Sequence, residues 1–194
     1  ALWTHARIEE GRVREAPLMT RIVVAIDPAV THGEDADDTG IIVAGRDRHG
    51  HGYVLADVSV NAPPDAWARR AVGAFEEWRA DRVVAESNQG GEMVALTLRT
   101  IAPRLPITLI HASRGKQARA EPVSALYEQG KVHHVGAFPA LEDELCSWTP
   151  DSGMKSPDRL DAMVHAMTEL LLTRPHTDAG MPMGVGVGGG AGER

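Results

Sequence analysis

The stretch "VVAESNQGG", residues 83–91, places a glutamate and a polar, glycine-rich turn directly after a run of apolar residues. The apolar run has the composition of a buried strand, and Glu86 falls at its carboxyl end. A buried carboxylate without a positive partner is costly. Glu86 therefore either faces water or binds a cation together with acids from other parts of the chain.

A second apolar run also ends on a carboxylate. "RIVVAI" (21–26) is followed by Asp27 and Pro28, and its composition is again that of a buried strand. Ligands of open α/β sheets bind at the edge formed by the carboxyl ends of the strands. If the two strands are neighbours, Asp27 and Glu86 converge at that edge.

Strands and helices are expected to alternate along the rest of the chain. Strand composition recurs at 39–45, 52–60 and 107–112, and "KVHHV" (131–135) is a candidate short edge strand. Helical spacing or end signals mark 64–78, 91–102, 116–130, 140–148 and a final helix that begins at Ser156 and Pro157. This order predicts an α/β domain with a mixed sheet of five strands flanked by helices.

The final helix supplies a third acid. On a helical wheel Asp161 lies at the rim of the apolar stripe, from which its carboxylate can reach the sheet edge. Asp158 and His165 are expected to lie farther round, toward solvent. Asp158 is then interpreted first as a charge that favours the helix dipole and second as an accessory to the site. His165 is interpreted first as a surface histidine and second as an accessory to the site.

Three carboxylates from separate elements, Asp27, Glu86 and Asp161, predict a site for one or two Mg²⁺ or Mn²⁺ ions. Such ions polarise a phosphodiester. The single cysteine excludes a cysteine-based zinc site. Because the three charges repel one another without metal, each neutral variant is expected to keep or gain stability. Asp158→Asn is expected to leave substantial activity.

Two further groups of residues are candidates for contacts with phosphate. Arg114, Lys116 and Arg119 follow the strand at 107–112 on the same edge as the acids. Asn88 and Gln89 precede a glycine pair that opens a helix, where free N–H groups favour an anion. The formal net charge of −7 requires any phosphate-binding surface to be local.

An acidic run follows the first predicted strand. Its carboxylates belong to Glu34, Asp35, Asp37 and Asp38. The run lacks the spacing of an EF-hand loop, and it is interpreted as a solvated loop rather than as a source of another ligand.

The motifs together resemble the nuclease domain of the large terminase subunit of tailed phages and gene transfer agents. The residues that carry this resemblance are "VVAIDPA", "GIIVAG", "RVVAESNQGG", "HASRGKQARAEPVSALYEQGKVHHVG" and "SPDRLDAMVHAMTEL", in that order. The resemblance implies an RNase H-like fold and metal-dependent cutting of concatemeric double-stranded DNA. The acidic triad of the family falls on Asp27, Glu86 and Asp161. The acidic "THGEDADD" loop departs from the family, in which this segment is often shorter.

The resemblance also implies a domain organisation. Residues 1–20 are similar to the connector that follows the packaging ATPase, residues 21–172 correspond to the nuclease domain, and residues 173–194 form a glycine-rich tail that is expected to be flexible. The chain has no P-loop motif, so the ATPase domain is expected to lie in a missing part of the same protein. Expected partners are double-stranded DNA, the portal and the small terminase subunit.

The sequence contains no run of 18 apolar residues and no signal peptide, which predicts a soluble, unexported protein without a membrane partner. The expected location is the cytoplasm of a bacterial host, at the assembling capsid.

Two alternatives to the packaging nuclease remain. One is a non-catalytic module that docks DNA or the portal. The other is a different RNase H-like nuclease, such as a junction resolvase or an RNase H.

Overall fold

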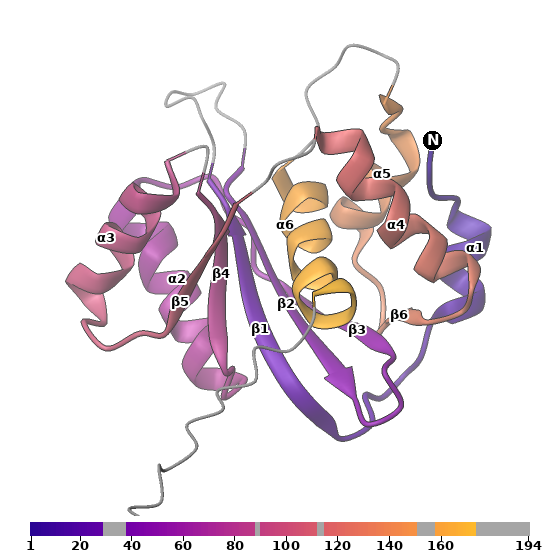
Figure 1. The fold of residues 1–194 in the computed structure, drawn as a ribbon, viewed down its shortest axis with the longest axis horizontal. Helices are drawn as coiled ribbons and strands as arrows, with labels where there is room; N and C mark the ends of the chain where they lie inside the picture. Colours follow the sequence, from indigo (N-terminus) through magenta and orange to yellow (C-terminus); the bar gives the residue numbers. More distant parts are fainter. Residues whose placement is uncertain (29–37, 88–89, 112–114, 151–157, 174–194) are drawn as a thin grey trace, which may run out of the picture.

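A six-stranded mixed sheet forms the centre of the computed structural model, which describes residues 1–28, 38–87, 90–111, 115–150 and 158–173 (Figure 1). In chain order the strands are β1 (Met19–Asp27), β2 (Gly40–Asp47), β3 (Gly52–Asp57), β4 (Arg82–Glu86), β5 (Ile107–Ile110) and β6 (Val132–His134). Their order across the sheet is β5-β4-β1-β2-β3-β6. β1, β2 and β3 pair antiparallel, whereas β4, β5 and β6 run parallel to their neighbours.

Helices cover both faces of this sheet. One face carries α2 (Pro64–Glu77) and α3 (Gly91–Ile101), and the other carries α1 (His5–Gly11), α4 (Lys116–Glu128), α5 (Pro139–Ser147) and α6 (Asp158–Met167). A π-helical turn, η2 (Thr168–Leu172), continues α6. None of the helices in the described ranges is long and apolar enough to cross a membrane.

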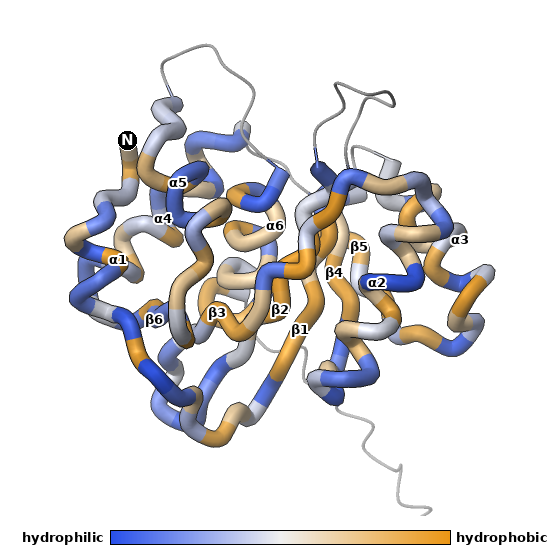
Figure 2. The backbone as a smooth tube through the Cα atoms, turned by 180° about the vertical axis from the view of Figure 1, so that it is seen from behind, coloured by the Kyte–Doolittle hydropathy of each residue, from blue (hydrophilic) through white to orange (hydrophobic). Residues whose placement is uncertain are grey.

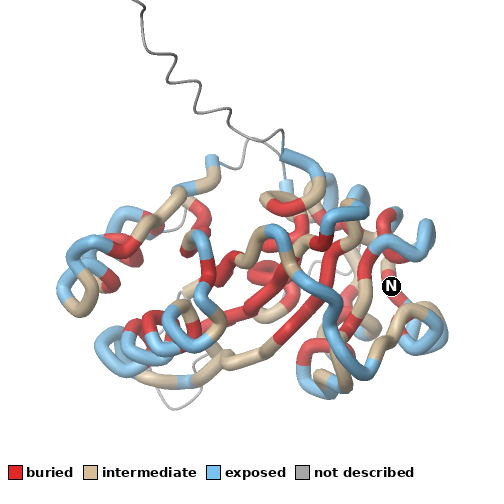
Figure 3. Tube along the Cα trace, turned by 90° about the horizontal axis from the view of Figure 1, so that it is seen from below, coloured by how far each residue is buried: buried red, intermediate tan, exposed pale blue. Residues whose placement is uncertain are grey.

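The alternation of side chains along β1 divides the core into two. Val23 and Ala25 pack with α1, α4, α5 and α6, whereas Val24 and Ile26 pack with α2 and α3. Successive residues of a strand point to opposite faces of its sheet, so a strand buried on both faces is apolar throughout. The central strands accordingly appear as an apolar and buried band in Figures 2 and 3.

The α/β class and the mixed sheet are confirmed, with one strand more than the five expected. The sixth is the candidate edge strand at 131–135, which pairs with β3 over 132–134. The prediction that Ser156 and Pro157 open the last helix falls outside the described residues, as does the tail from 174 onward.

Residues 1–13 pack against the same core as the predicted nuclease domain. Trp3 and Ile8 are buried among residues of α4, α5 and α6. Val13 forms a bridge with Val135 beside β6. The connector expected over 1–20 therefore contributes to the packing of the domain in the structure.

A part-buried ion pair fixes this N-terminal segment. Arg12 donates to both carboxylate oxygens of Glu142, at 2.8 and 3.0 Å, and also to the carbonyl of Gly136. His134 Nδ1 lies 2.8 Å from the same carboxylate, whose oxygen also accepts from the backbone N–H of Phe138. Burial alone would raise the pKa of Glu142, but the hydrogen bonds from His134 and Arg12 hold it well below its usual range.

Replacing Glu142 with Gln should destabilise the domain by about 3 kcal/mol at pH 7, because it leaves the Arg12 charge without its buried partner. A carboxylate with a lowered pKa stabilises the fold above its ordinary pKa and loses that effect as the pH falls. The difference between variant and wild type should therefore shrink below about pH 4.5. Urea denaturation at pH 7 and pH 3.5 measures both effects.

Glu10→Gln is the matched control, since Glu10 pairs with Arg7 on the surface with 66% of its side chain exposed. Its stability should stay within about 0.5 kcal/mol of wild type. Equal effects of the two substitutions would contradict the assignment of Glu142 as the anchor of the N-terminal segment.

Candidate metal centre

Asp27 and Glu86 are brought together by the pairing of their strands. β1 and β4 are parallel neighbours, and the pairing of Ile26 with Ala85 makes the next residues, Asp27 and Glu86, adjacent at the carboxyl edge. Both carboxylates are buried. The expected convergence of the two acids is therefore present in the structure.

α6 brings three further polar residues to the same edge. This helix packs against β1, β2 and β4 on one side and against α4 and α5 on the other. Its first turn lies directly against β2, because a Cβ atom on Gly40 would stand only 2.1 Å from the carbonyl oxygen of Asp158. Glycine at this position permits the close approach that puts Asp158, Asp161 and His165 beside the strand ends.

The group formed by Asp27, Glu86 and His165 has the spacing of a metal site. Each residue offers one ligand atom within 4.8 Å of the others, and all three residues are buried. Ligands about 2.1 Å from a shared Mg²⁺ lie about 3–4 Å from one another, so small side-chain adjustments would suffice. His165 Nε2 is 3.3 Å from an oxygen of Glu86.

Asp161, the third predicted carboxylate, adjoins this group. Burial first, and then the negative charges of Asp161 and Asp158, raise the pKa of Asp27 to about 8, against the opposing effect of Lys116. The site thus holds more negative charge than its own surroundings can stabilise. A bound divalent cation would relieve that excess, so the residues present fit a hard metal ion.

The expectation that Asp158 and His165 face solvent was wrong: only 4% and 3% of their surfaces are exposed. The helical wheel assumes a helix with one buried face. α6 is enclosed by the sheet, α4 and α5, and nine of its ten residues are buried. The hydrophobic stripe of α6 therefore does not show which of its residues face solvent, and both residues lie beside the candidate site rather than at the surface.

Two basic side chains of α4 contact the acids. Lys116 Nζ lies 2.5 Å from Asp161 Oδ2, and Arg119 Nη1 donates to Glu86 Oε2 at 2.9 Å. His165, whose Nε2 lies 3.3 Å from Oε2 of Glu86, lowers the pKa of Glu86 to about 2, and Arg119 adds to this effect against that of burial. Arg114, Asn88 and Gln89, also predicted to contact phosphate, fall outside the described residues.

The position of Arg119 changes the stability expected for one neutral variant. Glu86→Gln would leave Arg119, whose side chain is only 17% exposed, without its carboxylate. Glu86 also has a lowered pKa, which marks a charge that the fold stabilises. We therefore keep the prediction that the neutral variant retains or gains stability for Asp27, which has a raised pKa, and withdraw it for Glu86.

The acidic run is represented among the described residues by Asp38, and this residue is not a free surface charge. Arg159 contacts Asp38, Asp57 and Glu144, at 2.5, 3.1 and 3.2 Å between the charged groups. Arg159 thereby connects the start of α6 to β3 and α5. Arg159 is not identified in the sequence analysis, although an arginine between Asp158 and Asp161, on a helix rich in apolar residues, was a usable signal.

The glycine pair after Glu86 has a steric cause. Gly90 adopts the left-handed conformation, with φ of 81°, which favours glycine. A Cβ atom on Gly91 would lie 2.2 Å from the carbonyl oxygen of Glu86. The pair therefore lets α3 begin directly against the backbone that carries a site residue.

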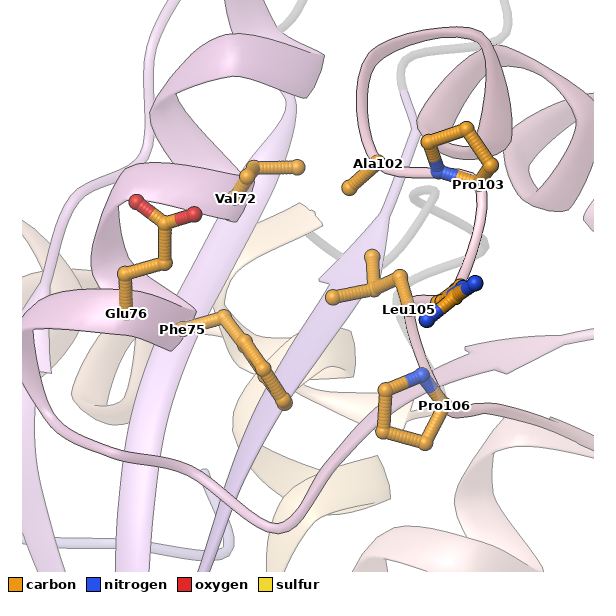
Figure 4. Close-up of a pocket in the computed structure, with 8 residues that line it drawn as sticks. Val72, Phe75, Glu76, Ala102, Pro103, Leu105 and Pro106 are labelled. Atoms are coloured by element: carbon orange, nitrogen blue, oxygen red, sulfur yellow. The ribbon is translucent and has the colours of Figure 1, made fainter.

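An apolar groove of about 390 Å³ lies elsewhere, between α2 and the loop that leads into β5 (Figure 4). Val72, Phe75, Leu105 and Pro106 line it. This loop enters the amino end of β5, whereas the acids lie at the carboxyl ends of β1 and β4. The groove is thus separate from the metal-type site.

A family model described as the terminase RNaseH-like domain matches residues 24–170. This chain belongs to that family. No curated protein sequence matches it significantly.

Solved structures of terminases share its fold. The large terminase of a thermophilic bacteriophage, solved in complex with ADP, is 12% identical, with a TM-score of 0.65 over 82% of this chain and 42% of that one. The nuclease domain of human cytomegalovirus terminase, Mn-soaked and inhibitor-bound, is 16% identical, with a TM-score of 0.61 over 86% and 93%. The large terminase nuclease of thermophilic phage G20c is 18% identical, with a TM-score of 0.56 over 81% and 91%.

These likenesses establish an RNase H-like fold of the terminase nuclease type. The chain spans less than half of the ADP-bound phage terminase but more than nine tenths of the two separately solved nuclease domains. It therefore corresponds in extent to the nuclease part of a larger terminase subunit.

Gly91→Ala should displace the backbone of Glu86, because the added Cβ cannot fit 2.2 Å from a carbonyl oxygen. The expected cost is about 1–3 kcal/mol of stability, with weakened metal binding. Gly73→Ala is the matched control: Gly73 lies in α2, and nothing stands within 4 Å of its Cβ position. That change should stabilise by about 0.5–1 kcal/mol. Thermal melting and Mn²⁺ titration of both variants measure these effects.

Asp27→Asn should stabilise the metal-free protein increasingly as the pH rises. A carboxyl group whose folded pKa exceeds its unfolded pKa binds protons in the folded state, so stability falls between about pH 4 and pH 8 as this group ionises. Asp27→Asn has no carboxyl group to ionise at this position. Its free energy of unfolding, relative to that of wild type, should therefore grow by up to about 1.4 kcal/mol per pH unit between those pH values. Urea denaturation in EDTA at pH 5, 6.5 and 8 measures the trend.

Asp65→Asn, a change at an exposed ion pair with Arg69, is the control and should show no such trend. A pH-independent difference between Asp27→Asn and wild type would contradict a raised pKa at Asp27.

Proposed function

We propose that this chain is a metal-dependent endonuclease that cuts concatemeric double-stranded DNA during phage-type genome packaging. The observation that supports this most directly is the buried cluster of carboxylates at the carboxyl edge of β1 and β4. Such a cluster is costly to fold without a cation. Membership of the terminase RNaseH-like family supports the reaction class.

Asp27, Glu86 and Asp161 would hold one or two Mg²⁺ or Mn²⁺ ions, with His165 as a further ligand. Carboxylate oxygens suit both ions, and the imidazole nitrogen is more readily used by Mn²⁺ than by Mg²⁺. The Mn-soaked cytomegalovirus nuclease domain is consistent with this choice. When bound, the metal supplies polarisation of the phosphodiester and an activated water.

The remaining residues of the site would position its carboxylates and neutralise the charge of the DNA phosphates. Arg119 holds the Glu86 carboxylate from one side, and His165 contacts it from another. Arg114 and Lys116 would contact DNA phosphates, as the sequence predicts. Asn88 and Gln89 are proposed as accessory contacts at the start of α3.

A module that only docks DNA or the portal would have no use for this arrangement. Asp27, Glu86, Asp158 and Asp161 are all buried, and burial together with the neighbouring charges raises the pKa of Asp27. Docking through phosphates requires cations at the surface instead. The cluster therefore favours catalysis over docking.

The proposed context is a large terminase subunit of a phage or a gene transfer agent. An ATPase domain of the same protein would be joined to this domain, since the ADP-bound phage terminase is more than twice as long as the matched part. The portal and the small terminase subunit are further proposed partners, in the host cytoplasm at the assembling capsid. Tethering there would supply a local DNA concentration that a domain of net charge −7 does not attract itself.

Nicking of supercoiled plasmid should require Mg²⁺ or Mn²⁺ and stop in excess EDTA. Asp27→Asn, Glu86→Gln and Asp161→Asn should each reduce the rate by roughly 100-fold or more, because the ligands act as a unit. Asp158→Asn should now also reduce it, since Asp158 is buried beside Asp27 and not on the surface. Asp65→Asn, at an exposed position of α2, should cut at the wild-type rate.

Two outcomes would contradict the proposal. Undiminished cutting in EDTA, with all four site variants active, would exclude the metal mechanism. A strong preference for four-way junctions or RNA–DNA hybrids over linear duplex would instead assign the chain to a resolvase or RNase H activity.

A further inference from the structure

We propose that Lys116 is a built-in competitor for the metal ion: its ammonium group neutralises Asp161 in the metal-free protein and must leave when a divalent cation binds. The proposal rests on the metal site of the proposed function and concerns how that site is regulated. It is carried by the position, exposure and helix context of Lys116.

The Lys116–Asp161 pair joins a movable cation to a fixed anion. Nζ lies 2.5 Å from Oδ2, and the lysine side chain is 35% exposed, whereas the aspartate side chain is 8% exposed. Lysine carries its charge on a flexible four-carbon stem. The ammonium group can therefore move toward solvent while Asp161 stays in place on α6.

The location of Lys116 is unfavourable unless the acids compensate for it. Lys116 is the first residue of α4, and no acidic residue or side-chain cap occurs in that first turn. The amino end of a helix carries partial positive charge, which disfavours a cation there. Attraction to Asp161 offsets this effect, so the role of Lys116 lies in the site rather than in the helix.

Arg119 differs from Lys116 in a way that separates their roles. The two residues are three positions apart on α4 and so share a helix face. The arginine side chain is only 17% exposed and donates to Glu86 at 2.9 Å. Arg119 is placed to remain on Glu86, whereas the more exposed Lys116 is placed to be exchanged.

Electrostatic repulsion would make a bound divalent cation displace the ammonium group of Lys116. The formal charges of Lys116 and Arg119 balance two of the four carboxylates at this edge of the sheet. A divalent ion coordinated by the same carboxylates would lie within a few ångströms of the ammonium group, and like charges at that distance repel strongly. The displaced ammonium would then be free beside the metal, where it can contact a DNA phosphate.

The test is Mn²⁺ affinity of the 194-residue chain, measured by isothermal titration calorimetry without DNA. Lys116→Met removes the competing charge and should bind Mn²⁺ about fivefold more tightly, the scale expected for losing one partly exposed ion pair. Lys116→Arg keeps the charge and should stay near wild type. Lys131→Met removes an exposed charge beyond the other end of α4 and should also leave the affinity unchanged.

Plasmid nicking at saturating Mn²⁺ gives a second readout. Lys116→Met should cut more slowly than wild type despite its tighter metal binding, because it lacks the phosphate contact. A lysine with a merely structural role would lower both affinity and rate when replaced.

Each outcome decides the proposal. The proposal is supported if Lys116→Met binds Mn²⁺ more tightly than wild type while the two control variants do not. The same holds if wild type binds Mn²⁺ too weakly to measure and Lys116→Met binds it measurably. Equal or weaker binding by Lys116→Met overturns it, and the metal site of the proposed function still stands if wild type binds and Asp27→Asn does not. Absence of Mn²⁺ binding in every variant overturns both.

Discussion

Burial of like charge at one edge of the sheet is the constraint on which the rest of this structure depends. Four carboxylates are enclosed at the ends of β1 and β4 and on α6. The pKa of Asp27, raised by burial first and by the neighbouring acids second, shows that this cost is not fully relieved. The surrounding elements each reduce it: α4 supplies Lys116 and Arg119, and α6 supplies His165. These groups lower the cost of holding the acids close together before a metal binds.

Backbone contacts fix the position of these charges as firmly as the ion pairs do. Gly40 lets β2 touch the first turn of α6, and Gly91 lets α3 start against the carbonyl of Glu86. Arg159 joins the same turn of α6 to β3 and α5. A site on strand ends and buried helices is more precise than one on loops, which suits chemistry that needs several ligands in register.

The residues that strand pairing brings together could be predicted from the sequence. The residues whose position depends on how other helices cover α6 could not. Asp27 and Glu86 were identified because each ends an apolar strand, and parallel strands place such ends together. Asp161 was chosen from a helical wheel, yet the same wheel put His165 at the surface, because a sequence does not show that α4 and α5 cover the other side of α6. The ion pair between Lys116 and Asp161 joins residues 45 positions apart and needs the tertiary structure.

The ion pair between Lys116 and Asp161 would affect both the metal affinity of the site and the stability of the metal-free domain. If no basic side chain paired with the carboxylates, the site would bind its metal tightly, but the metal-free fold would be less stable. With Lys116 already on Asp161, part of the attraction is used before the metal arrives, so affinity falls while the metal-free fold gains stability. The same exchange would make cation binding and the release of a phosphate-contacting lysine one event. A nuclease built in this way would engage the DNA backbone fully only once its metal is in place.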